Sequence, residues 1–311
     1  MEKTEIIIHT KLTIGVSACC MGSPVRYNGK GWDLLKNLGR EKNDFRWCPV
    51  CPECMAGLGV LREPIRLSGG DGTKVWTGDA EVKNRKGEIV TNKVIEGALA
   101  CIEALSRAGA IAYVYMDGSP SCGVYRTTLK NTNRGNPPGV FGAKLLELGF
   151  FLIPASDLQS PLKWWDWRRR LLAFYWLKNV PLDSKNQLYE AWYKTKFLCR
   201  ELNQEWTQNI GRNLALIVEE DVKEFGDRFR KEALDLLRKP SNTKKITNSL
   251  WAQYSYYKKL QGKSIEEINA PEIKRNVTSI AKELLLMERK AHEDKVFFGT
   301  SPVLYRDKRS N

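Results

Sequence analysis

Three cysteines and one glutamate lie close together in the stretch Cys48-Pro-Val-Cys51-Pro-Glu-Cys54. Cysteine thiolates at Cys-x-x-Cys spacing are typical ligands of zinc ions and of iron–sulfur clusters. Glu53 adds a carboxylate, which can take or give a proton beside a metal. The stretch therefore predicts a metal site with an acid or base next to it, and it leaves open which of the sulfurs bind.

The chain has 311 residues with eight cysteines but only two histidines, His9 and His292. This composition disfavours histidine-based zinc sites, Ser-His-Asp triads and Cys-His pairs, so proton transfer falls to a carboxylate, a hydroxyl or a lysine. The N-terminal residues do not resemble a signal peptide, and no apolar run is long enough to span a membrane. We therefore expect a cytoplasmic protein whose cysteines serve metal binding or catalysis rather than disulfides.

The elements that must position these cysteines alternate between apolar strands and amphipathic helices. We expect strands at 12–16, 45–49, 111–116 and 150–153, and helices at 92–108 and 139–148. Residues 68–88, with many Gly, Asp and Lys, are expected to form a long surface loop, with a hairpin as the alternative. The alternation predicts an α/β, Rossmann-like domain built on a parallel sheet.

Cys19, Cys51 and Cys122 each follow a predicted strand by a few residues. The carboxyl ends of parallel strands lie along one edge of a sheet, where sites form, so these three thiols can converge. Three thiols without a histidine fit an iron–sulfur cluster better than a structural zinc ion, which needs a fourth ligand. A zinc site, or thiols that are reactive or merely buried, remain alternatives at this point. Cys101 and Cys199 lie on apolar helix faces and are expected in the core.

A break near 153–161 separates this region from a second half with helical spacing throughout. We therefore predict two domains, 1–157 and 158–311, of which the second is mostly α-helical. The formal net charge is +14, and residues 161–311 carry 30 Lys/Arg against 20 Asp/Glu. A basic second half favours a polyanionic partner, nucleic acid first, with a solvated basic surface as the plainer alternative.

The predicted helix at 162–179 combines tryptophans with a run of three arginines, 168–170. Aromatic rings interleaved with cations are typical of grooves for nucleic acid, where cations bind phosphate and rings stack on unstacked bases. The alternative is a docking helix whose rings belong to the core.

Several short motifs, in this order, resemble the thiouracil desulfidase (TudS-like) family over about residues 11–157. They are Ser17-Ala-Cys19, Arg26-Tyr-Asn-Gly29, Cys51-Pro-Glu53, Gly57-Leu-Gly-Val-Leu-Arg62 and Ser119-Pro-Ser-Cys122-Gly. The resemblance implies a 4Fe-4S cluster held by Cys19, Cys51 and Cys122, with one iron left open for the sulfur of the substrate. It also implies that Glu53 and Ser119 act on the substrate while water attacks the ring carbon.

Three further residues of these motifs, Arg26, Arg62 and Ser121, are expected to contact the substrate. For the two arginines a structural ion pair is the alternative. The second half resembles, more weakly, the helical YbgA-like domain, for example in Tyr193-Lys-Thr-Lys-Phe-Leu and in Ser301-Pro-Val-Leu-Tyr305. Fused proteins of that kind resemble desulfidases of 4-thiouridine in transfer RNA, whose helical domain binds the RNA.

The resulting hypothesis is an iron–sulfur-dependent desulfidase that converts 4-thiouridine in transfer RNA to uridine. The base must then leave its stack to reach a crevice at the sheet edge. A first alternative has the same chemistry on free thiouracil or thiouridine monophosphate. A second alternative is a non-catalytic, zinc-stabilised RNA-binding protein. Oligomeric state remains open.

Overall fold

A computed structural model describes residues 5–125, 138–218 and 221–307. The chain divides into two compact units, one of which is Lys11–Gln159; the other contains the residues from Ser160 onward together with the first ten. The predicted boundary lies two residues before this division. The first ten residues differ from the prediction, because they belong with the helical unit.

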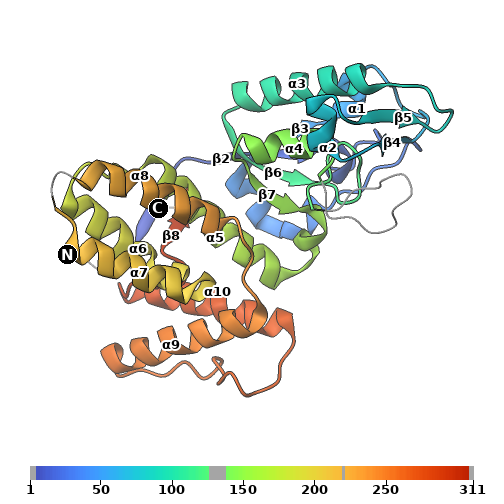
Figure 1. Cartoon of the computed structure of the whole chain (residues 1–311). Coiled ribbons are helices and arrows are strands. Elements are labelled where there is room, and N and C mark those ends of the chain that lie inside the picture. The colour runs from blue at the N-terminus through green and yellow to red at the C-terminus, as the bar shows by residue number, and fades with distance from the viewer. Residues whose placement is uncertain (1–4, 126–137, 219–220, 308–311) are drawn as a thin grey trace. The chain divides into compact units, whose positions relative to one another are not determined.

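A four-stranded parallel sheet forms the centre of the unit Lys11–Gln159 (Figure 1). Its strand order is β3-β2-β6-β7, and the bounds are β2 (Leu12–Ser17), β3 (Phe45–Val50), β6 (Ala110–Tyr115) and β7 (Phe151–Pro154). The strands β2, β6 and β7 are almost wholly buried, which explains their near-continuous apolar sequence. This sheet confirms the predicted α/β class.

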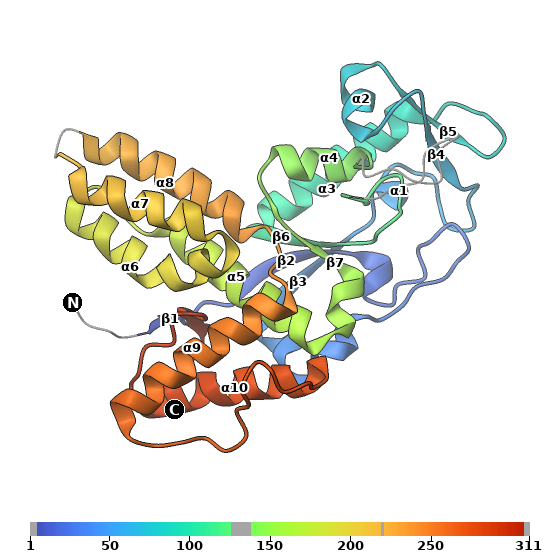
Figure 2. The same cartoon turned by 60° about the horizontal axis from the view of Figure 1, so that its bottom comes forward.

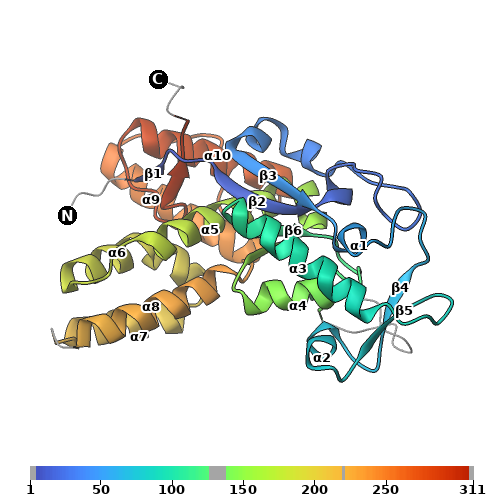
Figure 3. The same ribbon diagram turned by 90° about the horizontal axis from the view of Figure 1, so that it is seen from above.

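Helices cover both faces of this sheet, as crossover connections between parallel strands require. In Figure 1, α3 (Thr91–Arg107) and α4 (Val140–Glu147) lie on one face, and the 3-10 segments Leu35–Asp44 and Ala155–Gln159 on the other. Figure 3 shows α3 and α4 lying over the strands. The apolar face of α3 enters the core through Val94, Ala98, Cys101 and Leu105.

The stretch predicted as a long loop, residues 68–88, instead carries regular structure. Strands β4 (Ile65–Ser68) and β5 (Glu81–Asn84) pair antiparallel, and α2 (Gly72–Thr77) lies between them in the chain (Figure 3). Asp71 caps α2 by accepting a hydrogen bond from the backbone N–H of Lys74, and Gly78 ends the helix at φ 84°. The hairpin alternative was therefore the better interpretation; these elements are too short to show a clear period.

In the described part of the second unit there are six helices and one small sheet, which confirms its predicted helical character. Figure 2 shows these helices. The helices are α5 (Pro161–Asn179), α6 (Lys185–Leu202), α7 (Gln204–Leu216), α8 (Val222–Leu237), α9 (Thr243–Gln261) and α10 (Val277–Glu293). Strand β1 (Ile6–Ile8) pairs in parallel with β8 (Val303–Tyr305), and this pairing places the first residues in the helical unit. Among the described residues, no helix is both long and apolar enough to cross a membrane.

The tryptophan-rich helix α5 is a core element rather than an exposed groove. Trp164, Trp165 and Trp167 are buried, and Arg169 and Arg170 are at most 1% exposed. The guanidinium groups lie over tryptophan rings, Arg169 at 4.3 Å from the centroid of Trp165 and Arg170 at 4.0 Å from that of Trp167. The core interpretation of this helix therefore holds, and Arg169 and Arg170 serve the fold.

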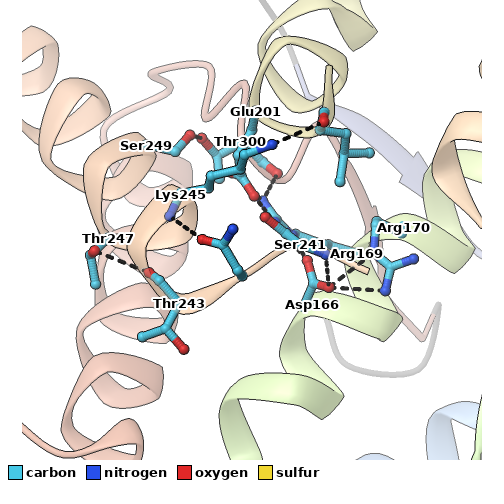
Figure 4. Close-up of polar contacts among 12 residues, drawn as sticks. Asp166, Arg169, Arg170, Glu201, Ser241, Thr243, Lys245, Thr247, Ser249 and Thr300 are labelled. Carbon is cyan, nitrogen blue, oxygen red and sulfur yellow. Dashed lines mark hydrogen bonds and ion pairs between the residues drawn. The ribbon is translucent and has the colours of Figure 1, made fainter. Parts of the chain in front are cut away.

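A buried charge network joins α5 to three other segments (Figure 4). Asp166 accepts hydrogen bonds from Arg169 at 2.6 Å and from Arg170 at 3.0 Å. Arg169 also donates to Glu201 of α6 and to the carbonyl of Thr300, while Arg170 donates to the carbonyl of Leu237. Burial opposes ionisation of Asp166, but the two arginines outweigh it and hold the pKa of the carboxyl below its usual range.

We expect the substitution Asp166→Ala to lower the free energy of unfolding by about 3–5 kcal/mol, because it leaves two buried guanidinium groups without their shared carboxylate. Urea unfolding followed by circular dichroism measures this. The matched control is Glu293→Ala, which removes one partner of the ion pair with Lys290 on the surface of the same unit. The urea concentration at the midpoint of unfolding should be almost the same for this control as for the wild type. Equal midpoints for the two variants would contradict a stabilising role for the network.

Candidate active site

A cavity of about 330 Å³ lies at the carboxyl ends of β2, β3 and β6. Its wall includes the last residues of β2 and β3, Ser17 and Val50, and Met116 just after β6. Cys19, Cys51 and Cys122 all line it. The structure thus brings together the three thiols that were expected to converge at this sheet edge. Their role as ligands remains a prediction.

Each thiol is held by a tight local turn. Cys19 lies in the 3-10 turn Ala18–Cys20, whose carbonyls at Cys19 and Cys20 accept hydrogen bonds from Trp32 and Leu34 at 2.7 and 2.9 Å. Cys51 is the extended residue before the short helix α1 (Pro52–Met55). A proline at the first helical position fixes φ without losing a hydrogen bond, so Pro52 sets the direction of this turn.

Cys122 lies in a turn organised by Ser119. The Ser119 hydroxyl oxygen accepts hydrogen bonds from the backbone N–H groups of Ser121, at 3.2 Å, and Cys122, at 3.0 Å. Behind the turn, the hydroxyl groups of Ser17 and Tyr113 share a hydrogen bond of 3.0 Å, and the Tyr113 oxygen lies 4.0 Å from the Cys122 sulfur. Sequence reasoning named Ser17 only as part of a motif, and it missed Tyr113, whose signal was a hydroxyl group within an apolar strand.

The electrostatic environment differs between the three thiols. Burial raises the pKa of Cys51 and of Cys122, and the Glu53 carboxylate raises both further. In contrast, a hydrogen bond with Cys20 lowers the pKa of Cys19. Burial raises this pKa, but the positive charge of Arg26 lowers it further, and the net shift is downward. The raised pKa values favour the protonated form of the Cys51 and Cys122 thiols. A metal that binds here must displace their protons.

Glu53 lies at the centre of the polar contacts in the cavity and is only 8% exposed. One carboxylate oxygen accepts from the Ser119 hydroxyl at 3.4 Å, and the other lies 3.4 Å from the Cys51 sulfur. Arg62 lies 3.9 Å from the same carboxylate. The two residues expected to act on the substrate, Glu53 and Ser119, are thus neighbours beside the thiols.

Helix α1, which carries Glu53, packs directly against α3. A Cβ atom added to Gly97 of α3 would lie 2.2 Å from the carbonyl oxygen of Pro52 and 2.6 Å from the backbone nitrogen of Ala56. Only glycine permits this approach of two backbones. This contact with α3 fixes the position of α1 and therefore of Glu53.

The two arginines expected to contact the substrate differ in their surroundings. Arg62 donates to the carbonyls of Val25 and Gly59, each at 2.8 Å, so it ties two wall segments together. Arg26 lines the cavity with its guanidinium over the rings of Trp32, at 4.5 Å, and Tyr27, at 5.9 Å. Within the described part of the chain its guanidinium makes no hydrogen bond or ion pair, so its donors are available.

The remaining sequence-based assignments fall outside the cavity. Ser121 is fully buried but is not among the residues that line the cavity, so a direct substrate contact is not supported by its position. Cys48 and Cys54 do not line it either; Cys48 packs against the core, and the Cys54 thiol lies 3.8 Å from the carbonyl of Val25. Cys101 and Cys199 are buried, as expected. The described residues contain no group of three or more His, Cys, Asp or Glu arranged to hold a metal ion.

The chain is similar to known proteins over about half of its length. The family model described as 2-thiouracil desulfurase matches residues 14–157. The uncharacterized protein YbbK of Bacillus subtilis (strain 168) is 32% identical over 152 residues, which is 47% of this chain and 98% of YbbK. Among solved structures, the 4Fe-4S-dependent thiouracil desulfidase TudS matches with 28% identity and a TM-score of 0.40, covering 48% of this chain and 93% of TudS. The chain described here belongs to the 2-thiouracil desulfurase family.

Proposed function

We propose that this protein is a desulfidase that replaces the sulfur of a thiolated uracil by oxygen, using a 4Fe-4S cluster bound to Cys19, Cys51 and Cys122. The observation that supports this most strongly is the cavity itself. Three thiols from three distant segments line it together with the Glu53 carboxylate and the Ser119 hydroxyl. A thiol set for metal and an acid/base group therefore face the same space.

The chemical type of the donors fits a cluster rather than a single ion, for which the described residues offer no group of three ligands. All three candidate ligands are cysteines, the ligands that 4Fe-4S clusters use, and the cavity has no histidine among its lining residues. The thiols are distributed over three loops around the cavity wall, which suits a ligand larger than one ion. When bound, the cluster would supply an iron without a protein ligand, which acts as a Lewis acid on the thiocarbonyl sulfur.

The side chains of this chain supply the proton transfers. Overall, thiouracil and water give uracil and hydrogen sulfide, with no oxidation or reduction. Glu53 is the base that takes a proton from the attacking water, and it returns a proton to a ring nitrogen or to the departing sulfur. Ser119 donates toward Glu53 while its oxygen accepts hydrogen bonds from two backbone N–H groups, so its hydroxyl is held at the cavity wall beside Glu53.

The guanidinium of Arg26 is the group best placed to recognise the substrate outside its ring. It lines the cavity, its donors are available, and two aromatic rings limit its movement. A guanidinium binds carbonyl and phosphate oxygens through paired N–H groups. We propose that Arg26 contacts an oxygen of the substrate nucleotide, whereas Arg62 holds the wall and the position of Glu53.

We further propose that the thiolated uracil is 4-thiouridine in transfer RNA. The support is the charge of the second half, where residues 161–311 carry 30 Lys/Arg and 20 Asp/Glu. A basic surface binds the phosphate backbone without regard to sequence. The target base must then leave its stack to enter the cavity.

A comparison of three substrates tests the proposal. The cluster-reconstituted full chain is incubated with transfer RNA containing 4-thiouridine, with 4-thiouridine monophosphate and with free 4-thiouracil, and released sulfide is measured. We expect sulfide from all three and the highest kcat/KM for the transfer RNA at low salt. A kcat/KM for the free base equal to that for RNA would overturn the RNA substrate alone. No sulfide from any of them would overturn the desulfidase proposal.

A further inference from the structure

A cluster of cations and aromatic rings lies along helix α6. It consists of Trp192, Tyr193, Lys196, Phe197 and Arg200, and we refer to it as the α6 patch. The Lys196 ammonium lies 4.1 Å from the ring centroid of Tyr193 and 5.0 Å from those of Trp192 and Phe197. Arg200, one turn further on, lies 5.4 Å from the ring of Phe197 and is exposed.

The cations of the α6 patch have no carboxylate partner among the described residues, since neither Lys196 nor Arg200 forms an ion pair there. Lys194, on the same helix, provides the contrast because it pairs with Glu190 at 3.1 Å. Partial burial lowers the pKa of Lys196, and the positive charge of the nearby Arg200 lowers it further. Two neighbouring positive charges without a counter-charge form a site that attracts anions.

The rings of the α6 patch are fixed by close packing. Tyr193 stacks on Phe297 with ring centroids 6.4 Å apart and planes 22° apart. A Cβ atom added to Gly299 would lie 2.4 Å from a ring atom of Phe197, and one added to Gly211 would lie 2.8 Å from the Trp192 ring. The rings therefore hold the Lys196 ammonium in a defined position, so little side-chain freedom remains to be lost on binding.

A third cation lies at the end of the same helix. Lys245, near the start of α9 and labelled in Figure 4, donates to the carbonyl of Leu202 at 3.2 Å. The carboxyl end of a helix carries partial negative charge, which holds this lysine there. Lys196, Arg200 and Lys245 thus follow α6 toward its C-terminus.

We propose that the α6 patch is a binding site for the phosphate backbone of RNA, with Lys196 and Arg200 contacting neighbouring phosphates. Residues four apart on a helix have Cβ atoms about 5–6 Å apart, comparable to the spacing of successive phosphates in a strand. A nucleic-acid backbone offers such a regular row of charges, whereas an acidic protein surface does not. The inference rests on the proposed RNA substrate and names the surface that binds it.

Binding of an unmodified transfer RNA transcript to the full chain tests this proposal across a range of salt concentrations. Each phosphate contact contributes about 0.7–0.9 to the slope of log K against log salt concentration, so the double substitution K196A/R200A should reduce the slope by about 1.4–1.8. We expect at least a tenfold weaker affinity at moderate salt. Arg200→Ala alone, at an exposed position, should lose about half of the slope change.

The matched control is Lys194→Ala, which removes the same charge from the same helix at an ion-paired position. It should leave the slope unchanged, and all variants should release sulfide from free 4-thiouridine at the wild-type rate. If K196A/R200A and Arg200→Ala both kept the wild-type slope and affinity, the proposed role of the α6 patch would be overturned. The proposal of an RNA substrate would still stand. Displacement of the transcript by poly-glutamate at equal charge concentration would also overturn it, in favour of an acidic protein. No binding by the wild type would instead overturn the RNA substrate itself.

Discussion

Replacing either Cys51 or Cys122 by alanine is expected to abolish the iron content of the protein and all sulfide release. Both thiols line the cavity, and each substitution would leave one iron of the cluster without its protein ligand. Iron and acid-labile sulfide per chain, measured after anaerobic purification together with the visible absorbance, give the result directly. The wild type should contain about four irons per chain, and the two variants close to none.

Cys48→Ala and Cys54→Ala are the matched controls for this prediction. They come from the same short stretch as Cys51, but neither residue lines the cavity. Both variants should keep the iron content and the spectrum of the wild type. Loss of iron in Cys48→Ala and in Cys54→Ala, with iron retained in Cys122→Ala, would show that the compact three-cysteine stretch binds the metal by itself. The assignment of Cys19 and Cys122 as distant partners would then be wrong.

Glu53→Gln is expected to lower kcat/KM about 10²–10⁴-fold while the iron content stays at the wild-type value. Glutamine has the shape of glutamate and can still accept a hydrogen bond from Ser119, but it cannot take a proton from water. The wild-type carboxylate lies 3.4 Å from the hydroxyl of Ser119 and 3.4 Å from the Cys51 sulfur, so its loss acts beside a proposed cluster ligand. Sulfide release from 4-thiouridine at saturating and limiting concentrations measures the effect.

The control for Glu53→Gln is Glu63→Gln, the same change at an exposed residue next to Arg62 that does not line the cavity. Its kcat/KM should stay within a factor of about two of the wild type. The kcat/KM of Ser119→Ala should lie between those of Glu53→Gln and Glu63→Gln. The substitution removes a hydrogen-bond donor to Glu53 and leaves the backbone N–H groups of Ser121 and Cys122 without their acceptor. Full activity in Glu53→Gln would exclude Glu53 as the base and leave it as a partner of Arg62.

The sheet and the meeting of the thiols could be predicted from the sequence because both follow from one rule. Buried parallel strands are nearly continuous apolar runs, and the residues that follow them share one edge. This was enough to place Cys19, Cys51 and Cys122 at one cavity. It could not place Ser121, because neighbouring residues of a tight turn point in different directions and the turn geometry depends on Ser119.

Other features were missed because their cause is tertiary. The helix α2 and strands β4 and β5 are four to six residues long, too short for a periodic pattern, and they are stabilised by pairing and capping. The pairing of β1 with β8 joins the two ends of the described chain, and no local signal reveals it. The arginine run of α5 resembles a nucleic-acid groove in sequence, yet Asp166 and Glu201 neutralise two of its members, Arg169 and Arg170, inside the core.

The most direct test of the proposed chemistry combines metal content and turnover in a single anaerobic sample of the full chain. Iron, zinc and acid-labile sulfide are measured per chain, and the same sample is then given 4-thiouridine while uridine and released sulfide are followed. A cluster site predicts about four irons, little zinc, and uridine and sulfide in equal amounts. A colourless protein with one zinc per chain, and neither product after iron and sulfide reconstitution, would contradict it.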